Sequence, residues 1–161
     1  MDKGRWGRKD RLIRERRHDT YEEWGKRPDG TVCTRCGAVY EGGRWTWSGS
    51  TRQTGQAMCP ACQRIQDDYP AGILSLGGDF FRQHRKEIMN LIRNIEEQEK
   101  GPHPMERIIS VKEREEGGAM VTTTGVHVAR RIGEALQRSY QGEYSLKYED
   151  GEKSVRINWQ R

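Results

Sequence analysis

The chain has 161 residues, of which 32% are hydrophobic and 33% are charged, with a formal net charge of +5. This length accommodates one ordinary domain or two small ones, and the polar composition excludes a single large apolar core. No segment approaches the ~18 consecutive apolar residues of a membrane helix. The first apolar pair, Leu12-Ile13, lies among arginines and does not resemble a secretion signal. We therefore expect a cytoplasmic protein with reduced cysteines and no membrane partner.

Positive charge is concentrated at the N-terminus. Residues 1–17 carry a net charge of +5, which equals the formal charge of the whole chain. Such a segment is either a solvated tail or a phosphate-binding arm that orders on contact with its ligand. We expect residues 1–30 to form a flexible basic arm. Its predicted nucleic-acid contacts are Arg5, Arg8, Lys9, Arg11, Arg14, Arg16 and Arg17.

Two Cys-x-x-Cys pairs use every cysteine of the chain: Cys33 with Cys36, and Cys59 with Cys62. The 22 residues between the pairs slightly exceed the separation of about 15–20 that is typical of a ribbon-type zinc site. Four thiolates would close a tetrahedral shell around zinc, which indicates a structural ion because no position stays open for substrate. Two disulfides, a redox dithiol at Cys59 and Cys62, and an iron–sulfur role remain alternatives.

We expect residues 31–72 to form a zinc-ribbon module. Between the cysteine pairs, Gly42-Gly43 predicts a hairpin turn and residues 44–47 predict the returning strand. The two-residue period of a strand places Trp45 and Trp47 on one face, where we interpret them as packing beneath the zinc loop. Base stacking on Trp45 is the alternative. The predicted nucleic-acid contacts in this module are Arg35, Arg44, Trp45 and Arg64.

A longer helix is predicted to begin at Asp79, which is a good N-cap, and to end at the linker of residues 101–104. Apolar residues recur there at three- and four-residue steps, which indicates one buried stripe. We expect residues 73–101 to connect the zinc module to the remainder of the chain. The stripe comprises Phe81, His84, Ile88, Leu91, Ile92 and Ile95.

Residues 105–161 predict a small domain of order ββαββ. Strands are expected over 105–111 and 119–124, and a helix is expected to run through Ser139. Asp150-Gly151 then predicts the turn of a closing hairpin. This order favours an antiparallel sheet with the helix on one face, and an open face that displays Ser145, Lys147, Arg156 and Asn158. The predicted fold class is therefore α+β.

The helix of this domain carries further candidate binding residues. Arg130 and Arg131 either pair with Glu134 on a solvated face or contact phosphate. The helix start, from Thr124 to His127, is a second candidate for binding phosphate through its free amides. Because no Asp or Glu lies locally to orient the His127 imidazole, we recognise no catalytic set and expect no enzymatic activity.

Several motifs resemble those of a group of uncharacterised bacterial proteins with a four-cysteine zinc ribbon. These motifs are Arg16-Arg-His-Asp19, Gly43-Arg-Trp45, Cys59-Pro-Ala-Cys62 and Tyr69-Pro-Ala-Gly72. The cysteine pairs, together with residues 121–136, 140–143 and 155–159, are similar to the archaeal and eukaryotic NMD-type adaptor for nuclear export of the large ribosomal subunit. The bacterial resemblance covers most of residues 16–161. Together the resemblances imply a zinc-bound module, a small α+β domain and a ribosomal or structured-RNA partner.

These observations predict a zinc-stabilised, ribosome-associated RNA-binding protein that acts in assembly, dormancy or translation. Two other functions remain open. The protein could be a protein–protein interaction adaptor that does not contact nucleic acid. It could also be a thiol redox protein that uses Cys59 and Cys62.

Overall fold

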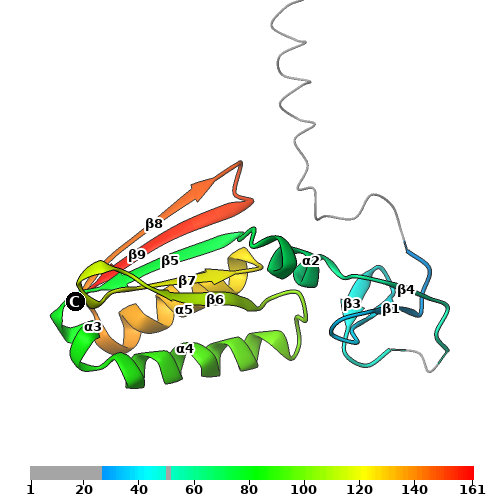
Figure 1. Ribbon diagram of the computed structural model, residues 1–161, viewed down its shortest axis with the longest axis horizontal. Helices are drawn as coiled ribbons and strands as arrows, with labels where there is room; N and C mark the ends of the chain where they lie inside the picture. The colour runs from blue at the N-terminus through cyan, green and yellow to red at the C-terminus, as the bar shows by residue number, and fades with distance from the viewer. Residues whose placement is uncertain (1–26, 50–51) are drawn as a thin grey trace, which may run out of the picture.

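The computed structural model describes residues 27–49 and 52–161. In this part of the chain, a small sheet lies beside a larger sheet that carries the long helices (Figure 1). The α+β class matches the prediction. Most of the expected basic arm lies outside the described residues, and so do seven of its predicted contacts: Arg5, Arg8, Lys9, Arg11, Arg14, Arg16 and Arg17.

The small unit, residues 27–67, combines a four-stranded sheet with one helix. Its elements are β1 (Thr31–Cys33), β2 (Val39–Glu41), β3 (Arg44–Thr46), β4 (Gly55–Ala57) and α2 (Pro60–Asp67). The sheet has the order β3-β2-β1-β4, with β1 antiparallel to β2 and parallel to β4. Gly42 and Gly43 make the predicted turn at φ values of 62° and 84°, which glycine adopts readily because it has no Cβ.

The large unit, residues 71–161, is built on a five-stranded sheet of order β6-β7-β5-β9-β8. Its strands are β5 (Gly72–Gly77), β6 (Ile108–Glu113), β7 (Ala119–Thr123), β8 (Glu143–Glu149) and β9 (Ser154–Gln160). Its helices are α3 (Asp79–Gln83), α4 (Arg85–Lys100) and α5 (Val126–Tyr140), with a 3-10 turn, η1 (Glu115–Gly117), between β6 and β7.

The predicted purely antiparallel sheet is wrong, because β5 occupies its centre. This strand pairs with β7 in antiparallel fashion and with β9 in parallel fashion. Residues 73–101 were expected to form a connecting helix, and no strand was predicted there. Its buried side chains are those of Leu74 and Leu76 alone, and an apolar run this short between glycines does not by itself distinguish a strand from a loop.

The long helices complete the core of the large unit (Figure 1). Ile88, Ile92 and Ile95 of α4 join the same buried cluster as Ile132 and Leu136 of α5. The segment expected to connect the two units therefore belongs to the fold of one of them, since its apolar stripe requires a buried partner surface.

One face of the five-stranded sheet displays the four polar residues expected there, all of them exposed: Ser145, Lys147, Arg156 and Asn158. None of the helices in the described segments is long and apolar enough to cross a membrane.

Candidate metal centre

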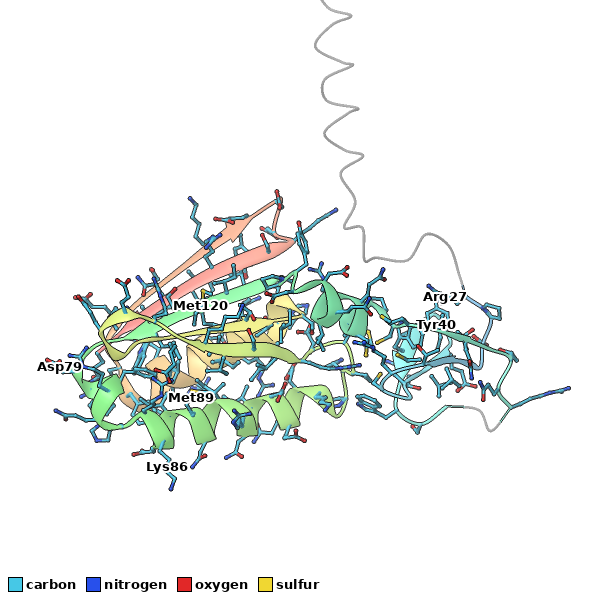
Figure 2. The ribbon with its side chains drawn as sticks, viewed as in Figure 1. Arg27, Tyr40, Asp79, Lys86, Met89 and Met120 are labelled. Carbon is cyan, nitrogen blue, oxygen red and sulfur yellow. The ribbon has the colours of Figure 1, made fainter. Side chains whose placement is uncertain are left out.

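The four cysteines come from two local structures that face each other. Cys33 ends β1 and Cys36 lies in the turn that follows, while Cys59 is the N-cap of α2 and Cys62 lies in its first turn. All four thiols are free, and their sulfur atoms lie within 4.8 Å of one another. Figure 2 shows sulfur atoms gathered between α2 and the small sheet. The predicted cluster is therefore present as a group that could hold a metal ion.

The distances between the sulfurs fit a tetrahedral metal site. The Cys36 and Cys59 Sγ atoms are 3.8 Å apart. Metal–sulfur bonds of about 2.3 Å at tetrahedral angles place two sulfurs about 3.8 Å apart, whereas a disulfide requires about 2.05 Å. The donor set and its geometry therefore suit zinc, and the disulfide alternative does not agree with this structure.

Backbone amides surround the sulfurs as they do in tight metal-binding turns. The Cys59 N–H donates to Cys33 Sγ at 3.2 Å, and the Cys62 N–H donates to Cys59 Sγ at 3.4 Å. Burial would raise the pKa of the Cys33 thiol, but amides of Cys36, Cys59 and Arg35 outweigh it and lower this pKa to about 6. Burial raises the pKa of Cys59 and of Cys62, so these two sulfurs depend more on a nearby cation to remain thiolates.

Such a cation reaches the cluster from the large unit. Arg107, which directly precedes β6, is only 6% exposed. Its guanidinium donates to Cys36 Sγ at 3.1 Å, to Cys62 Sγ at 3.2 Å and to Cys59 Sγ at 3.6 Å. Burial would lower the pKa of Arg107, but the hydrogen bonds to Cys62 and Cys36 outweigh it and raise this pKa above its ordinary value. Three of the four sulfurs thus share one buried positive charge.

The surroundings of Arg107 hold its side chain in place. Its Nε donates to the Pro104 carbonyl at 2.6 Å, and its guanidinium carbon lies 5.3 Å from the centre of the Trp47 ring. Its backbone N–H donates to Thr124 Oγ1 at 2.8 Å. A guanidinium constrained in this way holds several N–H donors in a fixed planar arrangement. The flexible side chain of a lysine would not reproduce this arrangement.

The sequence pattern did not indicate that Arg107 lies at this site. This residue lies 45 positions after Cys62, within a segment that was assigned to a strand beginning at residue 105. The strand actually begins at Ile108, and Met105 packs against the core of the small unit instead. The one local signal is a charged residue between Met105 and an apolar strand, which is too weak to indicate a contact with cysteines.

Two of the predicted nucleic-acid contacts in the small unit are buried. Arg64 is 6% exposed and donates to the Tyr69 carbonyl at 3.1 Å, just beyond the end of α2. Trp45 is 7% exposed and packs edge-on against Tyr40, so its ring face is not open to a base. The strand expected over residues 44–47 ends at Thr46, and Trp47 lies beyond it and is exposed. Arg35 and Arg44 are exposed, as expected.

The arginine pair of α5 divides between two roles. Arg130 is paired with Glu134 of the same helix at 3.6 Å, whereas Arg131 reaches across to Glu99 of α4 at 3.2 Å. Arg130 also lines a cavity of about 330 Å³ together with Arg64 and Lys153. The structure therefore brings two predicted contacts from distant parts of the chain to one cavity, while it assigns Arg131 a contact between helices.

The first turn of α5 already contacts an anion from the chain itself. The Glu106 carboxylate accepts from the Val128 N–H at 3.0 Å, and it also lies against Gly125, the N-cap. An acidic group at this position is stabilised by the helix dipole. A phosphate that bound the same amide would have to displace Glu106, which weakens the phosphate interpretation of residues 124–127.

Comparison of the chain with known protein families, with curated proteins and with solved structures finds no match. The description of this site therefore rests on its own geometry: a buried four-cysteine group suited to zinc, with an arginine from the neighbouring unit against its sulfurs.

Proposed function

We propose that this protein is a zinc-stabilised RNA-binding protein whose partner is the ribosome or another structured RNA. The observation that carries the proposal is the net charge of +5 on residues 1–17, directly ahead of a unit built around four cysteines. Clustered lysines and arginines bind the phosphate backbone of a nucleic acid and release its counterions. This release of counterions supplies most of the affinity that does not depend on sequence.

Zinc is the ion that the donor set favours. Four thiolates in tetrahedral geometry suit zinc or an iron–sulfur centre, and zinc is the usual ion for two Cys-x-x-Cys pairs in a small unit. Its closed shell would supply folding energy and no catalytic chemistry. In this proposal zinc holds the small unit in shape, so that Arg35 and Arg44 are displayed on a rigid surface.

The cavity lined by Arg64, Arg130 and Lys153 supports an RNA partner in a second way. These three residues come from α2, from α5 and from the turn between β8 and β9. Their side chains surround a space of about 330 Å³. Glu152 also lines this cavity, so its charged side chains sum to a net charge of +2. An excess of positive charge at a concave surface raises the local concentration of phosphate groups.

The decisive experiment measures the affinity for a structured RNA as a function of salt concentration. Each phosphate contact adds roughly −0.7 to −0.9 to the slope of log K against log salt concentration. Deletion of residues 1–17 should therefore flatten the slope, and the double variant Arg130→Gln, Lys153→Gln should flatten it less. If the slope does not change when residues 1–17 are deleted, the proposal loses its basis.

A second measurement identifies the partner in the cell. The protein should sediment with ribosomal subunits at low salt and return to the top of the gradient at high salt or after nuclease treatment. An association that resists both treatments would instead indicate the adaptor function, with a protein partner.

A further inference from the structure

The two units of the described chain have separate apolar cores, and a buried cation bridges them. The backbone of Arg107 belongs to the large unit, because it is hydrogen-bonded to Thr124 at the end of β7. Its guanidinium donates hydrogen bonds to cysteine sulfurs of the small unit. We propose that the metal ion at the four cysteines controls the docking of the small unit onto the large unit, with Arg107 as the coupling residue.

The charges explain why docking should depend on the ion. A divalent ion with four thiolates carries two net negative charges, and Arg107 neutralises one of them from a buried position. When the ion leaves, amides still contact Cys33 Sγ and Cys59 Sγ, but no ion holds all four sulfurs together around the guanidinium. A buried charge without a fixed partner is strongly unfavourable, so Arg107 then favours exposure to water.

The other contacts described across the junction are weaker than this one: Met105 packs against the core of the small unit but is only partly buried, and the polar contacts are exposed. Trp47 Nε1 donates to the Lys100 carbonyl at 2.7 Å, and Lys112 pairs with Asp68 at 3.2 Å, both at exposed positions. Exposed ion pairs contribute little to stability. Without the ion, the units should therefore separate and move about the short link of residues 68–70, while the core of the large unit stays intact.

The coupling is reciprocal, as linkage requires. If the ion stabilises docking, then removal of Arg107 must weaken the binding of the ion. Contacts to metal ligands from the surrounding protein typically contribute 10–100-fold in metal affinity. We expect Arg107→Met to weaken zinc affinity by roughly 10–100-fold.

The test uses the full chain, labelled with nitrogen-15, and measures the rotational correlation time of each unit by NMR relaxation. The zinc-loaded wild type should show one correlation time for both units. After zinc removal with a chelator, the large unit should keep its dispersed signals and tumble faster, independently of the small unit. Arg107→Met at saturating zinc should also show two correlation times, and Arg107→Lys should lie between it and the wild type.

Arg131→Met is the matched control. It removes a cation that pairs with Glu99 inside the large unit, so it should tumble as one body with unchanged zinc affinity. Separation of the units in this variant too would overturn the proposal. So would a single correlation time in both the chelated wild type and zinc-loaded Arg107→Met. If Arg107→Met does not retain zinc, the chelated wild type alone decides the outcome in the same way.

This inference rests on zinc binding, and not on RNA binding. Elemental analysis of the wild type separates the two kinds of failure. Absence of bound zinc would overturn both the metal site and the coupling. One zinc per chain with units that never separate would overturn the coupling alone, and neither result depends on whether RNA binds.

Discussion

Arg107 and Thr124 are hydrogen-bonded to each other in both directions. The Arg107 N–H donates to Thr124 Oγ1 at 2.8 Å, and the Thr124 N–H donates to the Arg107 carbonyl at 2.8 Å. This pair joins the start of β6 to the end of β7. It also sets the direction in which the Arg107 side chain leaves the sheet, toward the cysteine sulfurs.

The first prediction concerns this pair. Thr124→Val removes a hydroxyl that accepts from the Arg107 N–H and donates to the Met105 carbonyl at 2.6 Å. Because the Arg107 N–H is buried, its loss of a partner should destabilise the protein by about 1–3 kcal/mol. Urea unfolding of the zinc-loaded protein measures the change.

Thr54→Val is the control for this prediction. Thr54 Oγ1 donates to the Asp29 carbonyl at 2.5 Å, but at an exposed site where water can replace the bond. Its loss should have the smaller effect, below about 1 kcal/mol. Equal effects of the two variants would contradict the role of the buried pair.

The second prediction concerns the metal ligands. Cys36→Ser should abolish stoichiometric zinc binding, and it should leave the small unit unfolded because its core is too small to fold without the ion. The core of the large unit is separate and should persist. Hydrogen exchange followed by mass spectrometry should show rapid exchange across residues 29–49 and retained protection across residues 128–136.

Thr34→Ser is the control for ligand loss, because it changes the same turn without touching a ligand. It should bind one metal ion per chain, measured as the absorption of the cobalt(II)-substituted protein. Retention of the metal and of small-unit protection in Cys36→Ser would contradict the four-thiolate site.

The third prediction concerns packing between α5 and the sheet. A Cβ at Gly133 would lie 2.9 Å from Tyr144 Cε2 and 3.2 Å from Ile157 Cγ2. Gly133→Ala should therefore destabilise the large unit by about 1–3 kcal/mol through overpacking, despite the better helix propensity of alanine. Thermal unfolding provides the measurement.

Gly101→Ala is the matched substitution with room for the new methyl group. Gly101 has helical angles (φ −55°, ψ −65°), and the nearest atom to its added Cβ is the Glu97 carbonyl oxygen at 3.7 Å. This change should stabilise the protein by about 0.4–1 kcal/mol, because alanine has less conformational freedom in the unfolded chain. The opposite order of the two variants would contradict the packing described for α5.

The fourth prediction concerns pH. Burial raises the pKa of Glu106 above its ordinary value of 4.5, against the lowering effects of the Val128 N–H and of His127. A carboxyl group with a raised pKa in the folded state stabilises that state at low pH, and this contribution is lost as pH rises through the folded pKa. The stability of Glu106→Gln should therefore increase relative to the wild type as the pH rises above 4.5.

Denaturant midpoints of the two zinc-loaded proteins across this range test the prediction, since other titrating groups largely cancel in the difference. A constant difference between the two proteins at all pH values would show that Glu106 ionises normally in the folded state.

The local elements of this chain were largely predictable from short-range patterns. The spacing of Cys33, Cys36, Cys59 and Cys62 predicted the four-cysteine group, because two residues between thiols suffice to direct both sulfurs to one ion. The apolar stripes of α4 and α5 and the turn at Gly42-Gly43 were predicted for the same reason: each depends on neighbours within a few residues.

Longer-range features were decided only by the tertiary structure. The alternation of Leu74 and Leu76 does not reveal that β5 is central and parallel to β9. Its pairing partners lie 83 residues later in the chain, and the residues next to β5 do not indicate which strand it will pair with. Arg107 is the second such case, since its contact with Cys62 depends on how β6 and β7 are joined and on how the two units meet. The sequence by itself determined that four thiols form one group. The tertiary structure decided which cation lies against them, because a buried charge is placed by the packing of both units and not by its neighbours in the chain.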